Sequence, residues 1–131
     1  MEAVGRKISK GKAVGEALVS TQPISFYGGV DPSNGKVVEK GHELEGKSIA
    51  GKILVFPQGK GSTVGSYTLY RLKKNGFAPA AIINKEAETI VAVGAIISEI
   101  PMVDKLPVTA YAALNTGMKV EVNASEAKVV F

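Results

Sequence analysis

The sequence predicts one α+β domain spanning residues 1–131, with a β-rich shell packed against helices in a β/β/α arrangement. A buried strand at 52–56, a helix at 62–75 and a second apolar strand at 80–84 form a strand–helix–strand unit. Such a unit implies parallel strands joined by a right-handed crossover. Alternating apolar residues at 119–123 and 127–130 add a closing hairpin, so the fold class is α+β.

The N-terminal part predicts further strands and one long loop. Residues 3–8 and 12–20 are expected to form two strands joined by a tight turn at 9–11. Residues 22–35 are dense in turn-forming pairs, and loops of this length within a domain are usually functional or disordered. A short strand is expected at 36–39.

The remaining elements are assigned from the same patterns. Residues 42–49 are polar and typical of turns, whereas residues 86–97 predict a helix with acidic residues in its first turn. Short strands are expected at 101–103 and 108–111, and a turn at 115–117. Gly76 stands where a helix that ends at residue 75 needs a left-handed residue.

Composition excludes several kinds of chemistry on this chain. The absence of cysteine excludes disulfides, thiolate metal sites and cysteine nucleophiles. The one histidine, His42, is expected in a surface loop, and no G-x-S-x-G motif accompanies it to suggest a serine hydrolase. The acidic residues lack the spacing of a metal-binding loop, so no metal site is expected on this chain.

Charge and hydropathy indicate a cytoplasmic protein. The net charge of +4 comes from scattered lysines without interleaved aromatic residues, so neither nucleic acid nor membrane is an expected partner. No apolar stretch reaches the eighteen or so residues of a membrane-spanning helix. The first residues lack the apolar segment of a signal peptide.

The candidate functional feature is the glycine-rich turn between the buried strand and the first long helix. It places Ser62 and Thr63 at a helix N-terminus, where free N–H groups and the helix dipole can bind an anion or support a serine oxyanion. Gly61 permits a close approach of the backbone. The Walker pattern is absent, because Lys60 precedes the second glycine. A plain turn with Ser62 as the N-cap remains the alternative.

A second candidate is the pair Gly28 and Gly29, followed by Asp31. This segment either closes over a ligand or forms an ordinary turn. Lys60 and Arg71 are the candidate contacts for a phosphate group, although the pattern favours a solvated or paired role for Arg71.

Four segments, in this order, resemble the small subunit of the aconitase X family: residues 25–31, 51–63, 78–84 and 93–101. The ordered combination covers nearly the whole chain. The resemblance implies the swivelling β/β/α domain found at the end of aconitases, and dehydration of a hydroxy acid. For the archaeal two-subunit members it implies loss of water from (R)-5-phosphomevalonate, giving trans-anhydromevalonate 5-phosphate in a modified mevalonate pathway to isoprenoids.

The resemblance also implies a larger partner subunit, forming a heterodimer, that carries an iron–sulfur cluster on its own cysteines. It makes Ser62 the proton acceptor, and Thr63 keeps a hydroxyl where relatives often have serine. The other residues expected to line the substrate site are Gly61, Thr63, Phe26, Gly28 and Gly29. Two alternatives stay open: a dehydratase of cis-3-hydroxy-L-proline, and a non-catalytic module that regulates a partner.

Overall fold

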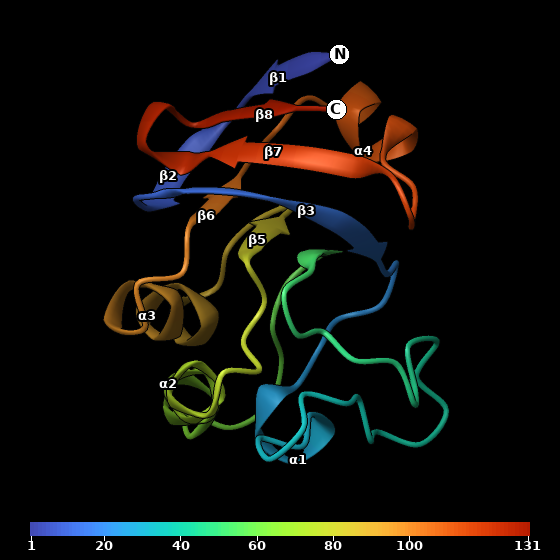
Figure 1. The fold of residues 1–131 in the computed structure, drawn as a ribbon, viewed down its shortest axis with the longest axis vertical. Coiled ribbons are helices and arrows are strands. Elements are labelled where there is room, and N and C mark those ends of the chain that lie inside the picture. Colours follow the sequence, from blue (N-terminus) through green and yellow to red (C-terminus); the bar gives the residue numbers. More distant parts are fainter.

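The computed structural model describes all of residues 1–131 as three layers, two of β-strands and one of helices (Figure 1). The fold contains four α-helices and one eight-stranded sheet, in which the strand order is β1-β8-β7-β3-β4-β5-β6-β2. The elements are β1 (Glu2–Val4), β2 (Arg6–Ser9), β3 (Lys12–Val19), α1 (Phe26–Gly29), β4 (Ile53–Phe56), α2 (Gly65–Asn75), β5 (Ala81–Asn84), α3 (Thr89–Ile97), β6 (Met102–Asp104), α4 (Val108–Ala113), β7 (Lys119–Asn123), a 3₁₀ turn (Ala124–Glu126) and β8 (Lys128–Val130).

The sheet bends into two layers that share β3. Strands β3, β4, β5 and β6 pair in parallel, while β7, β8 and β1 continue from β3 in antiparallel pairs. The two ends of the strand order, β1 and β2, are adjacent in the chain and separated only by Gly5. A side chain at Gly5 would overlap the Asp104 carbonyl oxygen, so the corner requires glycine. The layering confirms the predicted β/β/α arrangement.

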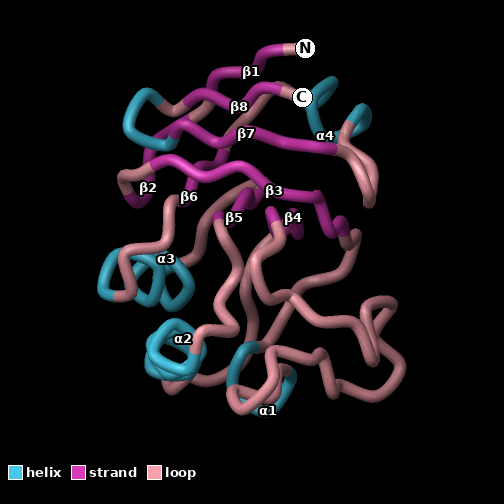
Figure 2. The backbone as a smooth tube through the Cα atoms, viewed as in Figure 1, coloured by secondary structure: helices cyan, strands magenta, loops and turns pink.

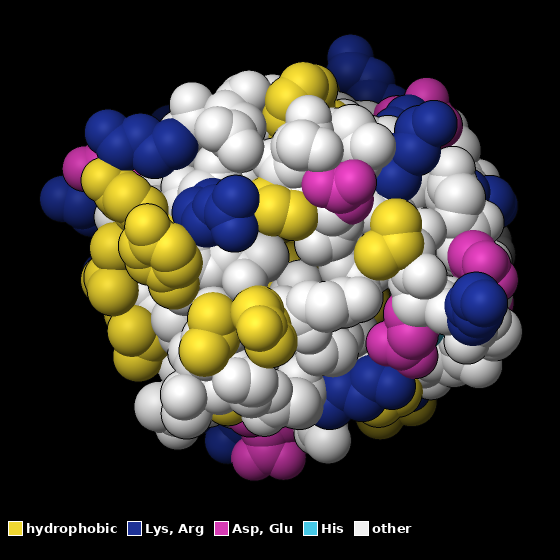
Figure 3. All heavy atoms as spheres, turned by 90° about the horizontal axis from the view of Figure 1, so that it is seen from below, with side chains coloured by type: hydrophobic (Ala, Val, Ile, Leu, Met, Phe, Trp, Pro, Cys, Tyr) yellow, Lys and Arg dark blue, Asp and Glu magenta, His cyan; other side chains and the backbone are white.

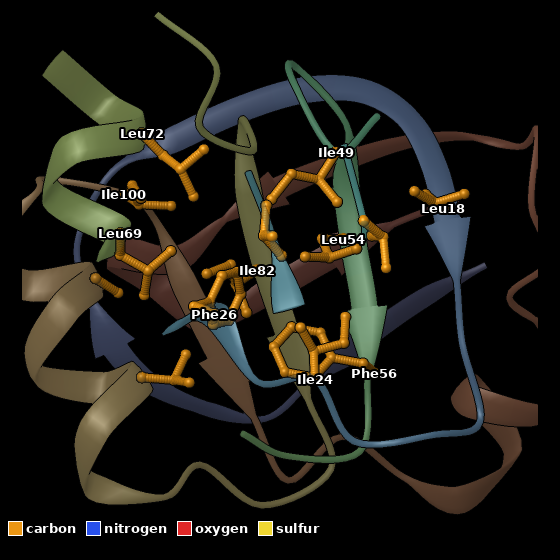
Figure 4. Packing of buried hydrophobic residues seen from close by; sticks show 14 of the residues in the cluster. Leu18, Ile24, Phe26, Ile49, Leu54, Phe56, Leu69, Leu72, Ile82 and Ile100 are labelled. Atoms are coloured by element: carbon orange, nitrogen blue, oxygen red, sulfur yellow. The ribbon is translucent and has the colours of Figure 1, made fainter. Parts of the chain in front are cut away.

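Strands β4, β5 and β6 bury both of their faces, which explains the continuous apolar runs in the sequence. Along β4, Ile53 and Val55 face the core between the two strand layers. Leu54 and Phe56 point the other way, into the core beneath the helices (Figure 4). Strand β5 alternates in the same manner, as the two-residue period of a strand requires.

Helices α2 and α3 end where the sequence predicts, but α3 begins at Thr89 and not at residue 86, so Glu86 and Glu88 precede the helix instead of standing in its first turn. Gly76 adopts φ +84° after α2, and the next amide, that of Phe77, donates to the Leu72 carbonyl oxygen over 2.9 Å. Helix α3 is capped by Glu88, whose carboxylate accepts from the N–H groups of Ile90 and Val91 at 2.7 Å each. No helix is long and apolar enough to cross a membrane.

The first predicted strand, residues 3–8, is wrong as a single strand, whereas the second, residues 12–20, is found as β3. Residues 3–8 are divided between β1, which pairs with β8, and β2, which pairs with β6, and β2 does not pair with β3. The turn at residues 9–11 exists, but its strands take partners from different parts of the chain. Long-range pairing in two separate layers therefore overrides the local hairpin signal.

Two other predicted strands are also wrong. Residues 108–111 belong to helix α4, which follows Pro107 with φ −55°, a value already suited to a helix start. Its buried residues Ala110 and Leu114 lie four apart, the spacing of a helix. Residues 36–39 form only isolated bridges, within a long segment between β3 and β4 that is mostly loop (Figure 2).

Candidate functional site

Ser62 lies exposed in the loop of residues 57–64, at the carboxyl end of β4, where α/β sheets commonly bind ligands. Its hydroxyl oxygen accepts a hydrogen bond from the Val64 N–H over 3.1 Å, and its carbonyl accepts from Gly65 over 2.9 Å. Helix α2 therefore begins at Gly65, three residues later than predicted, and Ser62 is not its N-cap. The hydroxyl forms a serine turn that competes with helix entry.

Four successive backbone N–H groups, those of residues 61–64, lie in the turn that carries Ser62. The N–H groups of Gly61, Ser62 and Thr63 make no hydrogen bond within the chain, and the Val64 N–H points at the serine oxygen. The positive end of the α2 dipole lies directly behind them. Successive donors of this kind bind an anion or stabilise negative charge on a hydroxyl oxygen.

The loop rests on the segment that follows β3. Gly59 and Ile24 form a parallel bridge, and the Lys60 N–H donates to the Ile24 carbonyl over 3.0 Å. Gly61 has φ +94°, and a side chain there would bring its Cβ within 2.6 Å of the Ser25 hydroxyl oxygen. The predicted close approach at Gly61 is thus an approach to Ser25 of the neighbouring segment.

The other side of the loop rests on the start of α3. A side chain at Gly59 would overlap the Glu88 carboxylate and the Val91 side chain. Glu88 is held in place by its capping bonds to α3, so it cannot move aside freely. Sequence reasoning missed Gly59, Ser25 and Glu88 as supports. The G-x-G spacing was the only local signal of such close packing.

The glycine pair lies next to the loop, on the short helix α1. The Phe26 ring is buried and packs edge-on against Phe56, with 5.9 Å between ring centroids. Gly28 is exposed with φ +82°, whereas Gly29 is buried, and its carbonyl accepts from the Val38 N–H over 2.8 Å. Phe26 therefore anchors the segment to the core, and Gly28 presents its backbone to solvent.

The candidate phosphate contacts lie apart from each other. Arg71, Gly28 and Asp31 share a surface hollow of about 250 Å³ that Ser62 does not line. Hydrogen bonds from the Ser33 hydroxyl and backbone lower the pKa of Asp31, so this hollow holds a carboxylate beside the arginine. The Lys60 ammonium pairs with Glu39 over 3.0 Å, which ties the Ser62 loop to the segment after α1.

His42 is buried, contrary to the prediction of a surface position. Its Nδ1 accepts from the Leu44 N–H over 3.0 Å, so the proton sits on Nε2, which donates to the Pro23 carbonyl over 3.1 Å. Both ring nitrogens therefore hold neighbouring loops together. No three His, Cys, Asp or Glu side chains lie close enough together to hold a metal ion.

Comparison with known proteins matches residues 2–131 to the family described as the aconitase X swivel domain. The phosphomevalonate dehydratase small subunit of Methanosarcina acetivorans is 66% identical over 93% of this chain and 85% of its own length. That of Thermococcus kodakarensis is 61% identical, covering 98% and 95%. A crystal structure of aconitase X from the latter organism superposes with a TM-score of 0.93 at 60% identity, covering 98% of this chain and 96% of that one.

Proposed function

Because this chain belongs to the aconitase X swivel-domain family, we propose that it is the small subunit of a phosphomevalonate dehydratase. The enzyme is a hydro-lyase that removes water from (R)-5-phosphomevalonate to give trans-anhydromevalonate 5-phosphate. Two curated relatives of that name, at 61% and 66% identity over nearly the whole chain, support this proposal.

Ser62 is the proton acceptor in this proposal. Loss of water requires removal of a proton from the carbon beside the carboxylate, and a serine oxygen is too weak a base unless its negative charge is stabilised. The Val64 N–H already donates to that oxygen. The N–H groups of Gly61 and Thr63 make no hydrogen bond within the chain, and with the α2 dipole they are the further donors that we propose for the charged oxygen. The observation that supports this role is one exposed serine hydroxyl that accepts from the Val64 N–H, in a turn whose neighbouring N–H groups are unpaired.

Gly28 and Gly29 hold the neighbouring segment at the edge of the site. Gly28 exposes its backbone, and Gly29 is fixed by its bond to Val38. Phe26 fixes the position of this segment through the core, where its ring packs against Phe56.

The iron–sulfur cluster expected of the family does not fit this chain, which has no cysteine and no cluster of metal-ligating side chains. We therefore assign the cluster to a larger subunit. The active site then forms between two chains, with the base on this subunit and the cluster on its partner.

The test combines this subunit, under anaerobic conditions, with the large subunit and its reconstituted cluster. Product formation from (R)-5-phosphomevalonate is followed with each chain alone and with both together. The proposal predicts turnover only with both chains present. A verified complex that dehydrates cis-3-hydroxy-L-proline but not (R)-5-phosphomevalonate would overturn the assignment of the substrate. Full turnover by the large subunit alone would overturn the catalytic role in favour of regulation.

A further inference from the structure

An apolar groove of about 390 Å³ runs along the solvent side of helices α2 and α3. Tyr67 and Ile97 form its walls and remain 61% and 57% exposed. Its other lining residues are Thr63, Ser66 and Tyr70. Figure 3 views the helix side of the molecule, and hydrophobic side chains gather on its left, where Figure 1 places α3.

Helix α3 has the composition of a helix that is covered on both sides. It contains no charged residue, and Val91, Gly94 and Ala95 already pack inward. On the outer face Ile96 is 55% exposed, and Val93 is exposed beside it. A surface helix normally carries polar residues on its outer face, so an apolar outer face indicates a protein interface.

The groove is continuous with the proposed catalytic loop. Thr63, the residue after Ser62, lines it directly, and the exposed side chain of Val64 extends the apolar surface between them. A protein that covers the groove therefore also reaches Ser62. An active site shared between two chains requires such an interface, because the partner must contact this chain next to Ser62.

The charges of the two helices indicate the chemistry of the partner. Helices α2 and α3 contain no acidic residue, and their only charged side chains are Arg71, Lys73 and Lys74. Lys74 lies over the Tyr70 ring, 5.5 Å from its centroid, at the rim of the groove. A second copy of this chain would bring Lys74 and its neighbouring cations against the same cations, whereas acidic residues bordering an apolar ridge would complement them.

We propose that this groove, with the outer face of α3, is the docking surface for the large subunit, which presents an apolar ridge bordered by acidic residues. The inference rests on the proposed function, because that function supplies the partner. The inference identifies the face of this chain that the large subunit covers.

The test measures the dissociation constant between purified large subunit and variants of this chain by calorimetry. Ile97→Asp and Tyr67→Asp each place a charge in the groove and should weaken binding by about tenfold or more. Val108→Asp is the matched control, since Val108 is 84% exposed on α4, which lies with the other hydrophobic core, and binding should be unchanged. Circular dichroism and thermal melting confirm that each variant is folded.

Wild-type affinity in both folded groove variants would overturn the inference. So would a dimer of this chain alone that Ile97→Asp dissociates, because the groove would then be occupied by a second copy. Measurements of turnover distinguish a failure of the proposed docking surface from a failure of the proposed function. At saturating large subunit, Ile97→Asp should regain wild-type turnover, which supports a docking role. A tight wild-type complex without dehydratase activity would refute the function, while the binding data alone decide the docking surface.

Discussion

Replacing Gly61 by alanine should slow dehydration without preventing folding. Gly61 has φ +94°, which costs a residue with a side chain about 1–2 kcal/mol. The new Cβ would also lie 2.6 Å from the Ser25 hydroxyl oxygen. That hydroxyl cannot swing away freely, because it donates to the Tyr27 carbonyl over 2.9 Å. The combined strain is about 1–3 kcal/mol, and the loop can relieve it by moving Ser62.

The catalytic consequence follows from the position of the base. A displacement of about 1 Å in a reacting group can cost on the order of 100-fold in rate. The assay is kcat of the reconstituted complex, together with the free energy of unfolding of this chain from urea titration. We expect kcat to fall by about 10- to 100-fold and the free energy of unfolding to fall by about 1–3 kcal/mol.

Gly117→Ala is the matched control. Gly117 has nearly the same φ, +95°, but no atom lies within 4 Å of its added Cβ. It should therefore lose about 1–2 kcal/mol of stability from backbone strain alone and keep its kcat. The double variant Gly61→Ala/Ser25→Ala removes the closest contact and should recover part of the rate. A Gly61→Ala complex with kcat within twofold of wild type would refute this reasoning.

Three further predictions concern the scaffold. Gly94→Ala would place a Cβ 2.7 Å from a leucine of α2 and should lower the free energy of unfolding by about 1–3 kcal/mol in urea titrations; an unchanged midpoint would contradict it. Tyr111→Phe removes a donor to the Asn84 carbonyl and an acceptor for the Leu106 N–H, and should cost about 1–2 kcal/mol by the same titration; wild-type stability would show that these bonds contribute nothing. Hydrogen bonds, chiefly from the Ser20 hydroxyl, lower the pKa of Glu43. The ionised carboxylate therefore stabilises the folded state at any pH above its ordinary pKa of 4.5, and this stabilisation is lost as the pH falls through the lowered pKa. Glu43→Gln should therefore melt below wild type at pH 7 and alongside it in strong acid; a constant gap across pH would exclude the carboxylate as the cause.

The elements with strong local signals were predictable from the sequence. Strand β4 consists entirely of buried apolar residues, and α2 ends at a glycine that adopts the left-handed conformation. The pairing of the N-terminal strands was not predictable, since residues 2–9 pair with strands that lie more than ninety positions away. Helix α4 was mistaken for a strand because its first four residues, 108–111, are apolar or β-branched. Such a short run does not distinguish a helix from a strand.

The candidate site divides in the same way. The turn that presents Ser62 was predictable, because a strand, a glycine-rich turn and a helix follow one another locally. Its supports were not, since Ser25 and Glu88 come from distant segments and meet the loop only in the folded chain. The burial of His42 also depends on a distant contact, the Pro23 carbonyl, that no local pattern indicates. The family resemblance identified Ser62 as the proton acceptor, and this remains a prediction.

The most direct test of that role is the turnover of a complex containing Ser62→Ala. The variant removes one exposed oxygen, whose hydrogen bond comes from the adjacent turn, so folding and affinity for the large subunit should match wild type. With affinity verified, we predict that dehydration of (R)-5-phosphomevalonate falls by at least about 100-fold. Turnover within a few-fold of wild type, in a complex of normal affinity, would contradict the assignment of Ser62 as the base.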